Sequence, residues 1–268
     1  MTATPATPRA GAPFPPHLVG ALMHGLAILD LYSAAERELG VGEMAKRLGV
    51  HKSSASRLAA TLSAAGYLEP AGAPGRYRLG SKLLGLAALA ADGDALPRVA
   101  VPVLEGLVAR CGETGHVAVL DGIEVVTVAV VDGWRSVRMH STVGKRSPAH
   151  ATAIGKALLA ALPDAEVRRR YGRRALERRT ANTIGSVPAL LEQLAEVRAK
   201  GWAADGEELE VGLRCVAAPV ADHTGAVVGA VGLSGPTDRI TATAARRLGG
   251  DLRATAAEVS AGLGACAA

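Results

Sequence analysis

The sequence predicts an α+β fold, with a small helical domain followed by an antiparallel sheet that has helices packed on it. Three observations support this class. Stretches with apolar residues along one helical face fill the beginning of the chain. Asp121-Gly122 and Asp132-Gly133 then separate three β-rich runs, and Asp-Gly between alternating apolar runs is the strongest short hairpin signal. Two more β-rich runs, with helical stretches on both sides, follow near the C-terminus.

Glycines and one turn-rich stretch delimit the elements of the first part. The first helix is expected over residues 17–33, where Leu18, Leu22, Leu26 and Leu29 share a face. The N-terminal residues 1–16 contain five prolines and are expected to be a disordered tail. The elements expected next are a helix over 41–48 ending at Gly49, a helix over 53–65 ending at Gly66, two short strands at 67–68 and 76–79 around EPAGAPG, and a helix from residue 81.

Asp92-Gly93-Asp94 breaks that last helix, and we place the boundary between the two parts there. The elements expected after it are a helix at about 96–111, three β-rich runs within 115–142, helices over 151–163 and 187–201, two strands within 212–235 around a His-Thr-Gly turn, and a helix over about 241–262.

Composition and charge limit the class of protein. Of the 268 residues, 49% are hydrophobic and only 3% aromatic, so the core must consist mainly of Ala, Val and Leu. The basic balance, with a formal net charge of +5, suggests a polyanionic partner. Cys111, Cys215 and Cys266 are far apart and odd in number, which favours a reducing cytoplasm over a disulfide framework. No apolar run approaches the roughly 18 residues that span a bilayer, and no secretion signal is expected.

A helix-turn-helix pattern occupies the middle of the first part. Ala45 is a small residue where two helices can cross, and Gly49 permits a left-handed turn. Ala55 and Leu58 follow as anchors of the second helix. On a helical wheel the apolar residues of 52–65 gather on one face. The opposite face is cationic and hydroxylic at its start and small afterwards, which suits close approach to a DNA groove.

The surplus charge of the whole chain lies in one segment. Residues 41–82 contain seven Lys and Arg but two Glu, and seven minus two gives the same +5 as the full sequence. We interpret this as a DNA-facing surface, with the hairpin as a basic wing; a solvated three-helix bundle is the alternative. The candidate DNA-binding residues are Lys52, Ser53, Ser54, Ser56, Arg57, Arg76 and Arg78.

These residues carry a resemblance to a known family. The stretch LGVHKSSASRLAATLSAAGYLEPAGAPGRYRLGSKLLGLA resembles the winged helix of the isocitrate lyase regulator (IclR) family of bacterial transcription factors. RMHSTVGKRSPAHATAIGKALLA, DGEELEVGLRCVAAPV and VVGAVGLSGP resemble that family's effector-binding domain. His51 departs from the pattern, because the family often has Pro there. The resemblance implies a GAF-like effector domain, homodimers that often pair into tetramers, and DNA binding switched by a small metabolite.

The same resemblance implies domains and an effector site. Ala153 and Ile154 would begin a helix whose free N–H groups suit a carboxylate, and Gly232 stands where some members carry a hydroxyl. The implied effector-binding residues are Met139, Ala153, Ile154, Asp205, Leu213, Cys215, Gly232 and Ser234. The expected domains are a tail at 1–16, a winged helix-turn-helix domain at 17–80, a linker helix at 81–94 and an effector-binding domain at 95–268.

Other chemical candidates are weaker. The basic run at 168–179 could touch DNA or an anion, but we interpret it as a solvated helix face. Cys215 could be a nucleophile, a small apolar filler or part of the effector pocket, and we favour the pocket. The spacing of His116, His140 and His150 does not resemble a metal-binding pair.

No enzyme motif is complete in the sequence. HATAIGKA lacks the first glycine and the hydroxyl residue of a P-loop, and no Gly-x-Ser-x-Gly elbow occurs. We therefore expect a cytoplasmic regulator without catalytic residues, cofactor or metal site, whose partners are double-stranded operator DNA, a small carboxylate effector and further copies of the chain. Two alternatives remain open: a second domain that only mediates assembly, and an enzyme with a fused regulatory head.

Overall fold

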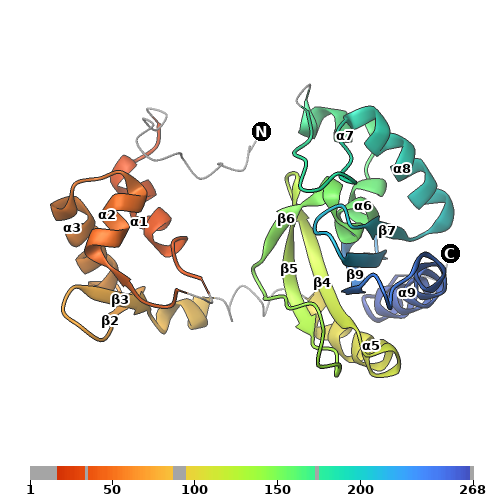
Figure 1. The fold of residues 1–268 in the computed structure, drawn as a ribbon, viewed down its shortest axis with the longest axis horizontal. Coiled ribbons are helices and arrows are strands. Elements are labelled where there is room, and N and C mark those ends of the chain that lie inside the picture. The colour runs from red at the N-terminus through yellow and green to blue at the C-terminus, as the bar shows by residue number, and fades with distance from the viewer. Residues whose placement is uncertain (1–16, 34–35, 87–94, 173–174, 266–268) are drawn as a thin grey trace. The chain divides into compact units, whose positions relative to one another are not determined.

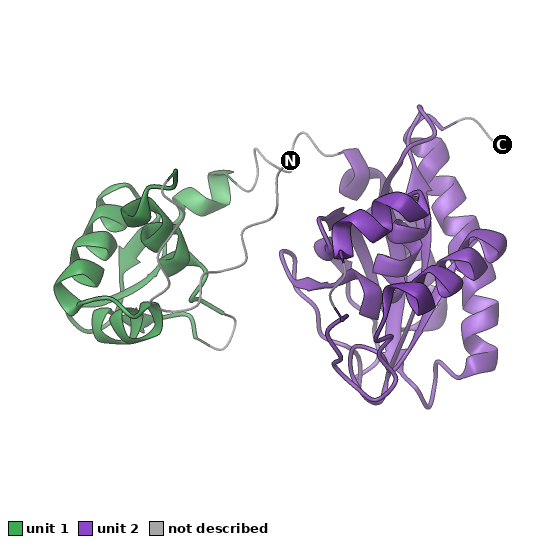
Figure 2. Ribbon diagram, turned by 90° about the horizontal axis from the view of Figure 1, so that it is seen from above, with its two compact units in different colours: residues 1–93 green, residues 94–268 purple. Residues whose placement is uncertain are grey.

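The computed structural model describes residues 17–33, 36–86, 95–172 and 175–265. These residues form two compact units that divide between Gly93 and Asp94 (Figure 2). The expected tail at 1–16 lies outside the described residues, as do residues 87–94 of the expected linker helix; residues 82–86 are helical. The expected domain limits stay a prediction.

The first unit is a winged helix-turn-helix, as the sequence predicts. Its helices pack on a small antiparallel sheet in which the strand order is β1-β3-β2 (Figure 1). The hairpin formed by β2 and β3 is the wing. The elements are α1 (Gly20–Leu29), β1 (Leu39–Gly40), α2 (Val41–Leu48), α3 (Lys52–Ala64), β2 (Leu68–Pro70) and β3 (Arg76–Leu79).

The turn between α2 and α3 has the expected chemistry. Gly49 has φ of 66°, a left-handed conformation that glycine adopts without a Cβ clash, and its N–H bonds the carbonyl of Ala45. Ala55 and Ala59 are fully buried, so α3 can pack closely on the other helices. The first helix is shorter than expected, because the chain turns after Leu29 and the Tyr32 hydroxyl donates to the carbonyl of Tyr77 on the wing.

The second unit is built on a six-stranded antiparallel sheet with the order β6-β5-β4-β9-β8-β7. One face is covered by α5 and α9, and the other by α6, α7 and α8 (Figure 1). The expected likeness to GAF domains stays a prediction. The strands are β4 (Thr114–Asp121), β5 (Glu124–Val131), β6 (Arg146–Pro148), β7 (Ala203–Gly206), β8 (Leu213–Ala221) and β9 (Val227–Pro236). The helices are α5 (Ala95–Cys111), α6 (Ala153–Ala160), α7 (Asp164–Tyr171), α8 (Val187–Lys200) and α9 (Ala242–Gly262), with a short 3-10 turn η1 (Ala149–Ala151) before α6.

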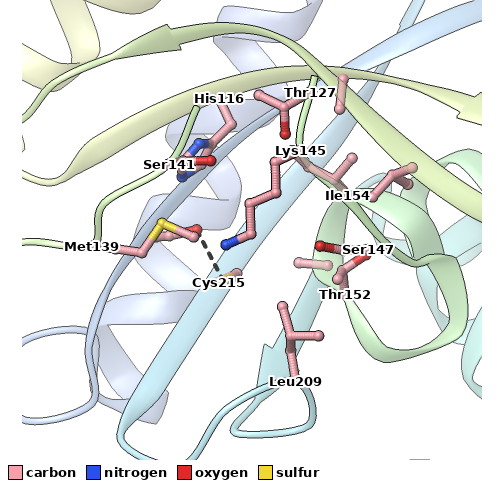
Figure 3. A pocket seen from close by; sticks show the side chains of 14 residues that line it. His116, Thr127, Met139, Ser141, Lys145, Ser147, Thr152, Ile154, Leu209 and Cys215 are labelled. Carbon is pink, nitrogen blue, oxygen red and sulfur yellow. Dashed lines mark hydrogen bonds between the residues drawn. The ribbon is translucent and has the colours of Figure 1, made fainter. Parts of the chain in front are cut away.

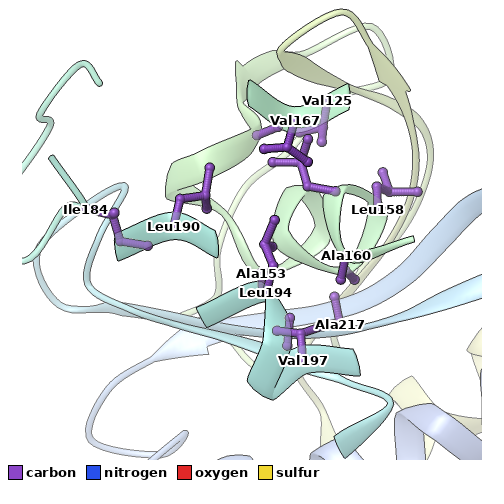
Figure 4. Packing of buried hydrophobic residues seen from close by; sticks show 14 of the residues in the cluster. Val125, Ala153, Leu158, Ala160, Val167, Ile184, Leu190, Leu194, Val197 and Ala217 are labelled. Atoms are coloured by element: carbon purple, nitrogen blue, oxygen red, sulfur yellow. The ribbon is translucent and has the colours of Figure 1, made fainter. Parts of the chain in front are cut away.

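Two apolar cores lie on the two faces of this sheet, and both use small and branched aliphatic residues. The core beneath α6 and α8 joins Ala153, Leu190 and Leu194 to Ala217 on β8 (Figure 4). A Cβ at Gly155 would lie 2.1 Å from the carbonyl oxygen of Ala149, so only glycine lets α6 start this close to the preceding turn. This close packing fixes the start of α6 relative to the turn η1.

One of the two expected Asp-Gly hairpins is confirmed and the other is wrong. Asp121 pairs with Glu124 across a tight turn in which Gly122 has φ of 63°. After Asp132, by contrast, residues 132–142 form no strand, and the chain returns to the sheet only as β6. The physical reason is tertiary packing: the Trp134 indole N–H donates to the carbonyl of Ala109, and the Thr114 hydroxyl to that of Met139.

The strands β1 and β7 are additional to the elements expected from the sequence. The basic run expected as a helix face is helical only to Tyr171, where α7 ends, and residues 175–179 are not helical. Among the described residues, no helix combines the length and the hydrophobicity that crossing a bilayer requires.

Candidate DNA-binding surface and effector pocket

The exposed face of α3 presents the polar residues that the sequence singled out. Ala55 and Ala59 hold the opposite face in the core, so the side chains between them point outward. Lys52 and Arg57 have no hydrogen-bond or ion-pair partner within the described part of the chain, and their ammonium and guanidinium groups are available to phosphates or bases. The exposed candidates on this helix are Lys52, Ser53, Ser54, Ser56 and Arg57.

The wing arginines are in a different state, because both are paired within the unit. Arg76 Nη2 donates to the carbonyl of Glu38 at 2.8 Å, and Arg76 Nη1 lies 3.5 Å from Glu43 Oε2. Arg78 Nη2 lies 3.1 Å from Glu69 Oε2. Both arginines therefore reach any phosphate only in competition with a carboxylate.

Two further basic residues of segment 41–82 also have partners within the unit. Arg47 forms a two-point ion pair with Glu36, at 2.7 and 2.6 Å. Lys82 donates to the carbonyl of Ala65 and lies over the Tyr67 ring. Unpaired positive charge in this segment, among the described residues, thus lies on the two helices of the helix-turn-helix, at Lys46, Lys52 and Arg57.

A pocket opens in the second unit, between the sheet and the start of α6 (Figure 3). Its empty volume is about 450 Å³, which includes space open to solvent. Five separate regions contribute its walls: β4 and β5, the segment 139–147, the start of α6, the loop after β7, and β8 with β9. The lining residues are His116, Ala118, Val125, Thr127, Met139, Ser141, Lys145, Ser147, Thr152, Ala153, Ile154, Leu209, Cys215 and Ser234.

Five of the eight residues that the resemblance assigned to the effector line this pocket: Met139, Ala153, Ile154, Cys215 and Ser234. The other three lie beside or beneath it. Gly232 is under Ile154, where a Cβ would come within 2.9 Å of Ile154 Cγ1. Asp205 is buried opposite Cys215 in the β7–β8 register, and Leu213 is buried opposite Pro236 at the start of β8.

The sulfur of Cys215 is a neutral thiol. Burial raises the pKa of this thiol, and the neighbouring Asp205 carboxyl raises it further. The Ser234 hydroxyl donates to the Cys215 sulfur at 3.0 Å. Because the thiolate is the nucleophilic form, Cys215 is suited to line a pocket and not to attack a substrate.

Two polar residues in the pocket were missed by the sequence interpretation. Lys145 is the one charged side chain among the described lining residues, and its chain extends into the pocket in Figure 3. His116 is 4% exposed, and its Nε2 has no partner among the described residues. Burial, followed by the nearby Lys145 charge, lowers the pKa of His116 to about 4, so the ring is neutral at pH 7.

A signal for one of the two exists in the sequence. His116 alternates with Ala118 along β4, and this period of two places both on the face that looks toward α6. Lys145 follows a turn with Gly144 at φ of 84°, and no local pattern indicates where its side chain points.

The three histidines considered for a metal do not come together. In the described ranges no cluster of three or more His, Cys, Asp or Glu could hold a metal ion.

Comparison with known proteins gives one family for both units. Residues 21–72 match the IclR helix-turn-helix domain, and residues 89–261 match the bacterial transcriptional regulator IclR C-terminal domain. The HTH-type transcriptional regulator KdgR of Dickeya chrysanthemi is 39% identical over 206 residues, which are 77% of this chain and 68% of that protein. XynR of Escherichia coli (strain K12), also an HTH-type transcriptional regulator, is 36% identical over 83% of this chain and 88% of its own length.

The fold agrees with this relationship. A putative transcriptional regulator from Rhodococcus sp. RHA1 superposes with a TM-score of 0.79 at 32% identity, covering 92% of this chain and 98% of that one. The relatives are named as transcriptional regulators and not as enzymes, and the two family models cover both units of this chain. This protein is therefore a DNA-binding transcriptional regulator, and it belongs to the IclR family.

Proposed function

We propose that the pocket of the second unit binds a small carboxylate, and that this binding changes the affinity of the first unit for operator DNA. The observation that carries the proposal is the charge of the pocket. Lys145 lines it, and no Asp or Glu does so among the described lining residues. An anion entering such a site gains a favourable charge interaction and meets no repulsion from a lining acid.

The start of α6 adds a second attraction for an anion. The first N–H groups of a helix have no intrahelical acceptor, and the helix dipole makes this end positive. Thr152 satisfies one of these groups by accepting from the N–H of Gly155 at 3.0 Å. Ala153 and Ile154, the first two residues of the helix, border the pocket beside Lys145. Together the lysine and the helix start suit a carboxylate group.

The rest of the pocket suits a small molecule with one further polar group. Met139, Val125 and Leu209 supply apolar walls. Neutral His116 has a ring nitrogen without a partner, which can bond a hydroxyl or carbonyl of the ligand. An apolar pocket with a few converging polar groups is the usual form of a metabolite site.

A second role for this unit is assembly of several copies. Trp134, Val137 and Val143 are 65%, 69% and 66% exposed on the stretch between β5 and β6, and exposed apolar groups mark contact surfaces. We propose at least a dimer, and pairs of dimers as the larger assembly, because one recognition helix reads few bases and two-fold related half-sites raise affinity. The regulator would act in the cytoplasm, where its DNA is.

A melting experiment with paired probes tests the effector function. Acetate, pyruvate and benzoate are each compared with acetamide, pyruvamide and benzamide, which have the same shape without the charge. A ligand that binds only the folded state at 100 times its Kd stabilises it by about 2.7 kcal/mol. We expect at least one acid to raise Tm, its amide to have little effect, and Lys145→Met to lose the shift. If no acid shifts Tm while light scattering shows an oligomer, the second unit serves assembly alone.

A further inference from the structure

A buried ion pair lies next to the pocket and takes no part in the charge argument above. Lys156 Nζ is 2.6 Å from Glu208 Oε1 and 3.0 Å from Gln193 Oε1. The side chains of Lys156 and Glu208 are 1% and 7% exposed. Lysine and glutamate are almost never buried so completely, because each charge loses its hydration. Such a pair requires an explanation other than stability alone.

The pair joins two walls of the pocket. Lys156 is on α6, one turn after Ala153, which lines the pocket. Glu208 directly precedes Leu209, which lines the pocket from the loop after β7 (Figure 3). The loop between β7 and β8, residues 207–212, has no other side chain that reaches α6 through a hydrogen bond or ion pair within the described residues. The ion pair is thus the link through side chains from this loop to α6, while the hydroxyls of Thr180 and Thr183 donate to the carbonyls of Glu207 and Glu208 from another segment.

Other bonds hold the base of this loop and make its conformation specific. The Glu208 N–H donates to Asp205 Oδ1 at 2.7 Å, and the Gly212 N–H donates to Glu207 Oε2 at 2.8 Å. Glu207 has φ of 63°, the one non-glycine residue in the left-handed region among the described residues. A bulky residue persists there only when its surroundings determine the backbone. The loop is therefore held in one arrangement against its local preference.

We propose that the Lys156–Glu208 ion pair positions loop 207–212, and Leu209 with it, against the start of α6, and thereby sets the shape of the effector pocket. Lys156 and Glu208 are positioning residues in this assignment, since neither lines the pocket. The inference rests on the proposed function only in calling the pocket an effector site. The positioning role can be tested apart from an effect on stability, because two apolar residues of similar volume can replace a buried ion pair without loss of stability.

The test uses the full-length protein without ligand, so its result does not depend on whether the pocket binds carboxylates. Lys156→Met/Glu208→Met removes both charges and keeps the side-chain volume. Lys200→Met/Glu196→Met is the matched control, because it removes a lysine–glutamate pair of 2.7 Å that is exposed on α8. Amide hydrogen exchange is measured for segment 206–213 and for the β8–β9 strands, together with Tm.

We expect the Lys156→Met/Glu208→Met protein to melt close to the wild type, while segment 206–213 exchanges roughly tenfold faster or more and the β8–β9 strands do not change. The control pair should alter neither region. Wild-type exchange in 206–213 would overturn the proposal, because the loop would then hold its place without the pair. Equal acceleration in the loop and the strands would also overturn it, since the pair would be a general stabilising element.

A conservative variant keeps the test decisive if the double substitution does not fold. Glu208→Gln retains the shape and an oxygen acceptor for Lys156 but removes the negative charge. Faster exchange confined to 206–213 in this variant supports the positioning role, and wild-type exchange contradicts it.

Discussion

Arg76 Nη1 lies 3.5 Å from Glu43 Oε2, so the first residue of the wing strand β3 is paired with the first turn of α2. The same carboxylate oxygen accepts the N–H of Gly40 at 2.6 Å. Arg57, on the exposed face of α3, has no side-chain partner in the described part of the chain. Two arginines predicted to contact DNA therefore start from different states, and substitutions should affect them differently.

Arg57→Ala should weaken operator binding by about 1–3 kcal/mol without lowering Tm, because the side chain is exposed and unpaired. Fluorescence anisotropy with a DNA fragment from the upstream region measures the loss. Arg47→Ala is the control. It removes the same charge from an arginine already paired with Glu36, so it should lower operator affinity less. Wild-type affinity of Arg57→Ala would show that this arginine contacts neither a base nor a phosphate.

Glu43→Gln should strengthen binding to all DNA sequences. The amide oxygen can still accept the Gly40 N–H, but the charge that competes for Arg76 is gone. Arg76→Ala should weaken binding to all sequences and reduce the salt slope by about one. Titrations at several salt concentrations measure both variants. A loss that depends on one operator base would exclude a phosphate contact for Arg76, and unchanged affinity of Glu43→Gln would show that the pair does not compete with DNA.

Ser234→Leu should abolish the response to the effector and leave operator binding like that of the ligand-free protein. Ser234 is 4% exposed in the pocket wall, so a leucine side chain fills space that the ligand needs. In the wild type, ligand and DNA should alter each other's affinity by the same factor, worth about 1–3 kcal/mol. Operator titrations with and without the acid found in the melting experiment measure this coupling. A full response in the variant would place the effector site elsewhere.

The pH dependence of stability should show two opposite contributions from the second unit. Burial raises the pKa of Asp205 to about 7 from 3.8, so the folded protein holds a proton that the unfolded chain releases, and this stability is lost as pH rises from 4 to 7. The pKa of His116 falls to about 4 from 6.5, so its neutral ring costs stability as pH falls from 6.5 to 4.

Urea unfolding between pH 4 and pH 7.5 separates the two groups. Asp205→Asn should gain stability relative to the wild type as pH rises, and His116→Gln should gain as pH falls. Each unit of pKa shift corresponds to about 1.4 kcal/mol, so both slopes are large enough to measure. Curves of a variant and the wild type that run parallel would show that the replaced group does not titrate in this range.

The sequence by itself determined the elements whose signals are local. Gly49 with Ala45 and Ala55 predicts the helix-turn-helix, because a left-handed turn and a small buried residue are required within a few positions of one another. Asp121-Gly122 predicts its hairpin because the tight turn requires the left-handed conformation that Gly122 adopts. The helix boundaries of α2 and α8 also follow from their glycine caps.

The tertiary structure decided which charges remain free and which side chains meet in the pocket. Arg76 and Glu43, or Lys156 and Glu208, are far apart in sequence, and nothing in the spacing of either residue indicates its partner. The hairpin predicted at Asp132-Gly133 does not form, because the Trp134 indole N–H donates to a carbonyl near the end of α5 and this part of the chain does not join a strand. Hydrophobic period and turn chemistry act over a few residues, whereas ion pairing, burial and the direction of a side chain such as Lys145 depend on which segments the fold brings together.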